Sequence, residues 1–156
     1  MKKLIHQIFP PEFFASPAYA RGLVLGLVYL GVLLSELFTF EEFPGVVETF
    51  SLPGGHIVVV FLAGLLPLVA AAALPFLISM RLSHWSRRLS AAMVIAFPAL
   101  WLLIGLWLNI TAPGAPNAGL FGATIPLPFG WWLVVFALLW LWAAILCVKE
   151  LPARKK

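Results

Sequence analysis

Two side chains near the end of one apolar run have the chemistry to handle protons. Glu36 is the one carboxylate inside a run long enough to cross a bilayer, and it lies four residues before Phe40, roughly 6 Å inside the boundary at the α-helical rise. His56 begins the next run on the same side, and imidazole exchanges protons near neutral pH. We predict that Glu36 is a proton acceptor or a hydrogen-bond partner for a quinone headgroup, and that His56 completes a proton relay.

A structural explanation of Glu36 is the alternative: the side chain snorkels to the interface, or the helix ends one turn earlier. The loop that follows carries Glu41, Glu42 and Glu48 and has no basic residue. A solvated acidic loop is its default interpretation. The three carboxylates and His56 could also hold a divalent cation, but no ligand spacing is diagnostic, and we predict no metal site.

Other membrane chemistries lack their residues. His6, His56 and His84 fall in termini, loops or span edges rather than on facing helices, so we expect no haem. The central parts of the apolar runs contain no ionisable group, which disfavours transport of charged solutes. Cys147 is the single cysteine, so no intrachain disulfide can form. We expect no bound cofactor, with a quinone as the one candidate.

Four apolar runs must position these residues: 22–40, 57–80, 89–110 and 131–148. The chain has 156 residues, of which 63% are hydrophobic and 10% charged, and its mean hydropathy is +1.05. These values exclude an ordinary soluble enzyme. Inside a bilayer each run must satisfy its own backbone, so helices are expected. We predict an all-α fold, an integral membrane four-helix up-down bundle, as a single transmembrane domain over residues 1–156.

The basic residues predict the orientation. All ten Lys and Arg lie before the first run, between the second and third, or after the fourth, whereas residues 41–56 and 111–130 contain none. By the positive-inside rule these two loops are outside, and both termini are cytoplasmic. We predict a multi-pass protein of the cytoplasmic membrane. The first 20 residues are interrupted by prolines and lack an apolar core, so we expect no signal peptide.

Prolines, glycines and tryptophans within the runs indicate how the helices pack. Each proline removes an amide donor and frees the carbonyl four residues earlier, which predicts kinks that mostly shape the packing. The Gly22 and Gly26 pair fits close packing within the bundle or, alternatively, an oligomer face. Trp101 and Trp140 are predicted to be packing residues. The prolines are Pro67, Pro75 and Pro98, and the freed carbonyls are those of Ala63, Ala71 and Val94.

The order of these features resembles a known family. A basic residue opens the first run, Phe43-Pro44-Gly45 follows it, and the second run contains Leu65-Leu66-Pro67. A short turn, Met80-Arg81-Leu82-Ser83, precedes further arginines, and the last run is rich in Trp. Over residues 20 to 148 this resembles the DoxX superfamily of four-helix membrane proteins, including its MauE-like branch.

One loop segment carries the more specific resemblance and also departs from it. Asn117-Ala118-Gly119-Leu120-Phe121-Gly122 is similar to the Cys-Gly-Cys-Phe-Gly segment of MauE-like proteins. Ala118 and Leu120 occupy the cysteine positions. The outer-face thiol chemistry that the resemblance implies is therefore absent, because disulfide exchange needs a thiolate. The loop glycines and prolines then set its shape.

Three functions remain open. The leading hypothesis is an accessory, anchor or assembly subunit of a membrane redox system, because the resemblance implies redox partners and the chain lacks cofactor ligands of its own. The second is a quinone-reactive oxidoreductase subunit that uses Glu36 and His56. The third is a transporter or channel for a small neutral solute, which would need an oligomer. Expected partners are membrane lipid, a membrane or periplasmic protein and, in some arrangements, a second copy, but no nucleic acid.

Overall fold

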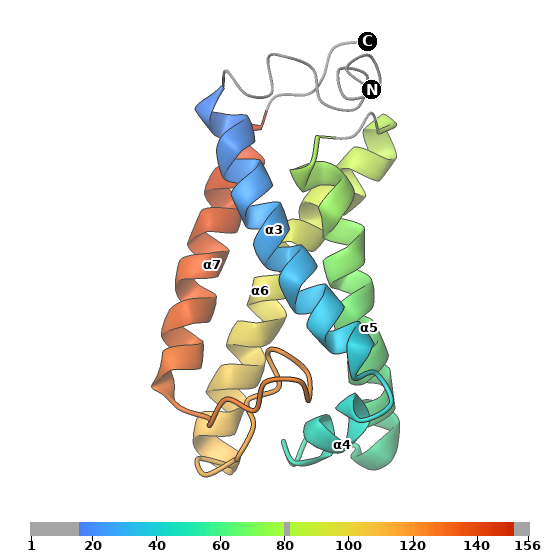
Figure 1. Cartoon of the computed structure of the whole chain (residues 1–156), viewed down its shortest axis with the longest axis vertical. Helices are drawn as coiled ribbons and strands as arrows, with labels where there is room; N and C mark the ends of the chain where they lie inside the picture. The colour runs from blue at the N-terminus through green and yellow to red at the C-terminus, as the bar shows by residue number, and fades with distance from the viewer. Residues whose placement is uncertain (1–15, 80–81, 152–156) are drawn as a thin grey trace.

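Four long helices and one short helix make up the part of the chain that the computed structural model describes, residues 16–79 and 82–151 (Figure 1). No strand occurs in these two ranges. The four long helices have 22, 23, 28 and 20 residues, and each is long and apolar enough to cross a membrane. The chain is a small multi-pass membrane protein. Its helices are α3 (Pro17–Phe38), α4 (Phe43–Glu48), α5 (Gly55–Leu77), α6 (His84–Thr111) and α7 (Trp131–Glu150).

The long helices form the predicted four-helix bundle. Helix α3 packs against α5 and α7, and α6 packs against the same two helices, so α3 and α6 face each other across the bundle. In Figure 1, α3 crosses obliquely from α7 at the top to α5 at the bottom. We call the lower end, which carries residues 39–54 and 112–130, the loop end, and the opposite end, with Arg21, Arg88 and Lys149, the basic end.

Several helix bounds differ from the predicted ones. Helix α3 spans Pro17–Phe38 rather than 22–40, α5 spans Gly55–Leu77 rather than 57–80, and α7 ends at Glu150 rather than 148. Helix α6 begins at His84 rather than near residue 89, because the Ser83 hydroxyl accepts the amide of Ser86 (3.2 Å) and so caps the first turn. The expected loop 41–56 contains the short helix α4, whose Phe43 and Val47 are buried one turn apart. The residues before Ser16 and after Leu151 lie outside the described ranges. The predictions that the chain has no signal peptide and that both termini are cytoplasmic therefore stay predictions.

Ser90 of α6 is inserted into the backbone ladder of α5 beside Pro75. The Phe76 amide donates to Ser90 Oγ (3.1 Å), and Ser90 Oγ donates to the carbonyl of Ala72 (2.6 Å). The hydroxyl thus replaces the direct bond between residues four apart in α5, a recognised cause of helix bending. It also joins α5 to α6 near the basic end of the bundle.

Tyr29 of α3 meets the second break in the ladders. Pro98 cannot donate to the carbonyl of Val94, and the Tyr29 hydroxyl donates to that carbonyl from across the bundle. The ring of Tyr29 also packs against Phe97 (5.3 Å between centroids) and Trp140 (5.0 Å, edge to face). The prediction of Trp140 and Trp101 as packing residues is confirmed, since they are 4% and 0% exposed.

The glycine pair of α3 packs inside this chain. A Cβ on Gly22 would lie 3.0 Å from the Leu77 carbonyl oxygen and 3.0 Å from Leu151 Cδ1, and one on Gly26 would lie 3.5 Å from Leu77 Cβ. Both glycines are buried. This confirms the intrachain interpretation of the pair and leaves it unavailable for an oligomer face.

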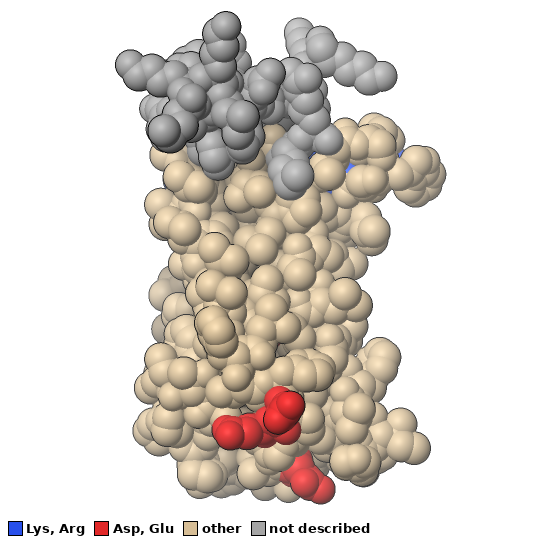
Figure 2. Space-filling model, turned by 45° about the vertical axis from the view of Figure 1, so that its right-hand side comes forward, with Lys and Arg blue, Asp and Glu red and all other residues tan. Residues whose placement is uncertain are grey.

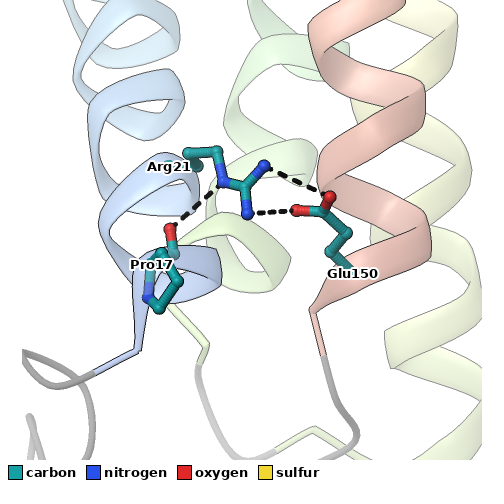
Figure 3. Close-up of polar contacts among 3 residues, drawn as sticks. All are labelled: Pro17, Arg21 and Glu150. Carbon is teal, nitrogen blue, oxygen red and sulfur yellow. Dashed lines mark hydrogen bonds and ion pairs between the residues drawn. The ribbon is translucent and has the colours of Figure 1, made fainter.

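Two arginines hold the end of α7 at the basic end. Arg21 of α3 pairs with Glu150 (2.9 Å) and donates through Nε to the Pro17 carbonyl (Figure 3). Arg87 of α6 donates to the Leu151 carbonyl (2.8 Å). Cations at a helix C-terminus complement its partial negative charge. The exposed Arg21 pair adds under about 1 kcal/mol.

We expect Tyr29→Phe to destabilise the bundle by about 1–3 kcal/mol, because it leaves the Val94 carbonyl without its donor. In a Pro98→Ala background the loss should be smaller, since the restored amide at position 98 can bond Val94 directly. Thermal or denaturant unfolding in a mild detergent would measure both. No loss in either background would show that Tyr29 stabilises through ring packing alone.

Candidate functional site

Glu36 lies in the last turn of α3 and is fully buried. Its side chain is 0% exposed, and the helix continues past it to Phe38. The interpretation that Glu36 snorkels is therefore wrong, and the helix ends two residues before the predicted Phe40 but after Glu36. Neither carboxyl oxygen has a hydrogen-bond partner within the described ranges. Burying a carboxyl without a hydrogen bond costs folding free energy. The packing around Glu36 must offset that cost, which makes the residue a candidate site.

His56 is separate from this carboxyl in its surroundings. It is exposed at the second residue of α5, and it does not hydrogen-bond Glu36, whose oxygens have no partner in the part of the chain that is described. The two residues do lie at the same end of the bundle, as predicted. The proposed relay between them stays a prediction.

A folded cap covers the loop end of the bundle, next to Glu36. We call residues 39–54, which include α4, together with residues 112–130 the loop cap. The loop 112–130 lies in front of α6, between α3 and α7 (Figure 1). Loops usually lie on the surface, yet apolar and glycine residues from both segments are buried here. They are Phe43, Val47, Phe50, Ala115, Ala118, Gly119, Leu120 and Gly122.

Hydrogen bonds tie the loop cap to the helical turn that carries Glu36. The Ala123 amide donates to Thr39 Oγ1 (3.0 Å), and Thr124 Oγ1 donates to the Ser35 carbonyl (3.2 Å). Thr39 Oγ1 donates to the same carbonyl (3.0 Å). We call these contacts the clasp. Its bonds to Ala123 and Thr124 join residues more than 80 positions apart in the chain.

Gly122 allows the clasp to close. Its φ is +59°, and a Cβ there would lie 2.5 Å from Thr39 Oγ1, 2.9 Å from the Ser35 carbonyl oxygen and 3.3 Å from Glu36 Cα. The left-handed backbone favours glycine, and the close approach requires it. The loop therefore lies directly against the backbone of Glu36.

Asn117 shapes the loop from within. Its Oδ1 accepts the Gly119 amide (2.9 Å), and its Nδ2 donates to the Gly122 carbonyl (3.0 Å). Gly119 packs on Phe50, and the Phe50 carbonyl in turn accepts the Trp107 indole N–H (3.2 Å). Sequence analysis missed the roles of Asn117, Ser35 and Thr39. The signal that was present is the Asn-x-Gly spacing, which is typical of an Asx turn.

The two positions that the expected resemblance aligns with cysteines carry buried apolar side chains. Ala118 is 0% and Leu120 is 2% exposed. Cys147, the one thiol of the chain, is buried on α7 near Gly22 at the basic end. A groove of about 430 Å³ between α3 and α7 also lies toward that end, lined by residues such as Val28 and Cys147. Neither the thiol nor the groove belongs to the Glu36 site.

The exposed surface of the loop cap is acidic. Glu41, Glu42 and Glu48 are exposed, and neither segment of the cap contains Lys or Arg. Figure 2 shows acidic side chains gathered at this end of the molecule on the face that it presents. No group of three His, Cys, Asp or Glu side chains that could hold a metal ion occurs within residues 16–79 and 82–151.

These features define a class: a small multi-pass membrane protein whose four-helix bundle carries a folded loop cap over a buried carboxyl. Comparison with family models, with curated proteins and with solved structures finds no match to this chain. The resemblance to the DoxX superfamily therefore stays a prediction.

We expect Gly122→Ala to open the clasp, because the added methyl group would overlap Thr39 and Ser35 and the φ of +59° disfavours alanine. The loss of stability should exceed about 1 kcal/mol, and protease cleavage within 112–130 should accelerate. Gly114→Ala is the matched control, since a Cβ at Gly114 meets nothing within 4 Å. If both variants are cleaved at the same rate, Gly122 does not hold the cap closed.

Proposed function

We propose that this chain is an accessory subunit of a membrane redox system, an anchor or assembly factor that acts through a protein partner bound on the loop cap. The observation that carries the proposal is the built surface of the cap. Fixing a loop costs roughly 1–2 kcal/mol per residue in backbone entropy, and here buried side chains and the clasp offset that cost. A surface that is ordered before binding favours recognition of a partner.

The charge of the cap indicates the chemistry of that partner. Three exposed carboxylates without a neighbouring basic residue in the cap attract a basic surface, and such complementarity speeds association and selects partners. The basic residues Arg21, Arg88 and Lys149 lie at the opposite end of the bundle. By the positive-inside rule the cap then faces outward from the cytoplasmic membrane, toward a periplasmic protein or the outer part of a membrane protein. The redox character of the system rests on the resemblance to DoxX-like proteins.

Purification of the tagged chain from its native membrane in mild detergent tests this function. We expect a stoichiometric partner with a redox centre and a basic contact surface. Replacing Glu41, Glu42 and Glu48 together by Gln should weaken its recovery at least several-fold, because the charge attraction is lost, and raised salt should do the same. The control variant carries Arg88→Gln and Lys149→Gln at the basic end and should retain the partner. Recovery of the chain alone, or as a homo-oligomer, from both low and high salt would contradict the proposal.

The burial of Glu36 favours a second candidate function, that of a quinone-reactive subunit. A carboxyl that has no partner in the described part of the chain and is held under a folded cap is suited to exchange a proton with a quinone headgroup.

If the purified chain or its complex reduces a short-chain quinone, Glu36→Gln should lower turnover by a factor of about 10²–10⁴, the usual contribution of a positioned acid or base. His56→Gln tests the relay in the same assay. Turnover and thermal stability that are both unchanged in Glu36→Gln would remove Glu36 from the mechanism.

A further inference from the structure

Two fully buried polar groups from opposite helices of the bundle lack a hydrogen-bond partner. One is the carboxyl of Glu36 on α3, and the other is the indole N–H of Trp101 on α6; both side chains are 0% exposed, and neither has a partner within the described ranges. Buried polar groups are almost always paired. Two unpaired groups of complementary type, an acceptor and a donor, therefore call for an explanation.

The helix register places the two groups in one layer. Helices α3 and α6 run in the same direction along the bundle, and the bond from Tyr29 to the Val94 carbonyl joins them across its interior. Glu36 follows Tyr29 by seven residues, and Trp101 follows Val94 by the same number. Seven residues are two helical turns, so Glu36 lies on the same face of α3 as Tyr29, and Trp101 lies on the same face of α6 as Val94. Because the two spacings are equal, Glu36 and Trp101 lie at the same height in the bundle. Both side chains thus lie inside the bundle about 10 Å from the Tyr29 bond toward the loop end.

Helix α7 contributes a small residue at this height. Gly105 packs on Leu133 (3.5 Å from its would-be Cβ); Trp101 lies one turn before Gly105, and Ala137 lies one turn after Leu133 on the antiparallel helix α7. Ala137 is fully buried. Its methyl group supplies neither a donor nor an acceptor.

We infer that Glu36 and Trp101 together bind one hydroxyl group. A hydroxyl oxygen accepts a hydrogen bond from the indole N–H. If Glu36 is ionised, the hydroxyl O–H donates a hydrogen bond to the carboxylate; if Glu36 is protonated, the second lone pair of the hydroxyl oxygen accepts one from the carboxylic acid. A hydroxyl therefore satisfies both side chains in either protonation state of Glu36. A cation suits the carboxyl alone, because the indole nitrogen only donates.

The hydroxyl has two sources, a resident water and a neutral molecule from the membrane such as a phenol or hydroquinone. The loop cap lies directly against this layer, since a Cβ on Gly122 would lie 3.3 Å from Glu36 Cα. The site does not depend on the partner role of the cap, and it deepens the quinone-reactive alternative by adding Trp101. Phenol binding and recovery of a protein partner are measured in separate experiments, so failure of the first does not imply failure of the second.

The test compares 4-butylphenol with butylbenzene, which has the same shape without the hydroxyl. Thermal unfolding of the purified full chain in mild detergent is followed as each compound is titrated. We expect the phenol to raise the Tm of the wild type and butylbenzene to leave it unchanged. Trp101→Phe and Glu36→Leu should each weaken the apparent affinity for the phenol about ten-fold, the effect of one buried hydrogen bond.

Trp140→Phe is the matched control. Trp140 is also buried, and its N–H also has no partner among the residues that the structure describes. It packs against Tyr29 and Phe97, one layer nearer the basic end. It should keep the wild-type response to the phenol. Because Trp101→Phe replaces one aromatic ring with another, it keeps the test decisive even if Glu36→Leu does not fold.

A double-mutant cycle distinguishes the sources of the hydroxyl. If the wild type ignores the phenol but Trp101→Phe and Glu36→Leu change the free energy of unfolding non-additively, while Trp140→Phe and Glu36→Leu add, the shared hydroxyl is a resident water. A phenol response confined to the intact pair identifies a membrane-derived ligand. If there is neither a phenol response nor non-additive coupling, the inference is overturned.

Discussion

The carbonyl of Val94, which Pro98 deprives of its helical donor, needs a hydrogen bond in a part of the bilayer that holds no water. Tyr29 supplies this hydrogen bond from the facing helix. Ser90 likewise bonds the Phe76 amide and the Ala72 carbonyl at the break beside Pro75. These side-chain bonds fix the heights of α3, α5 and α6 relative to one another. The aromatic packing of Tyr29, Phe97 and Trp140 and the layer that holds Glu36 follow from that register.

The loop cap and the buried carboxyl depend on each other. Without residues 112–130 against α3, the last turn of that helix would face solvent or lipid headgroups, and Glu36 could reach water. With the clasp closed, Gly122 lies against the Glu36 backbone and the carboxyl is sealed inside. The same fold that isolates Glu36 presents Glu41, Glu42 and Glu48 on the exterior. The proposed partner surface and the buried carboxyl are therefore separated by one layer of backbone.

Sequence reasoning predicted the parts of the structure that depend on local pattern. Hydropathy located the four long helices, and the proline positions identified Val94 as a carbonyl in need of a donor. It missed the early start of α6, because the Ser83 cap outweighs the polarity of the first turn, and it missed α4, which is too short to show a period. The burial of Glu36 could not be predicted, because it depends on contacts from Ser35 and Thr39 to Ala123 and Thr124, far along the chain. No local pattern contains that information.

The two mended breaks also bear on how the chain enters a membrane as it is synthesised. Tyr29 belongs to the first long helix, so its hydroxyl is already in place when Val94, ten residues into α6, is inserted. Ser90 has the opposite order, since it is made after the α5 break that it fills. That break lies at the last turn of α5, beside Phe76, where water at the membrane surface can serve the open backbone groups until α6 arrives. The deep break thus receives its donor early, and the late donor serves the shallow one.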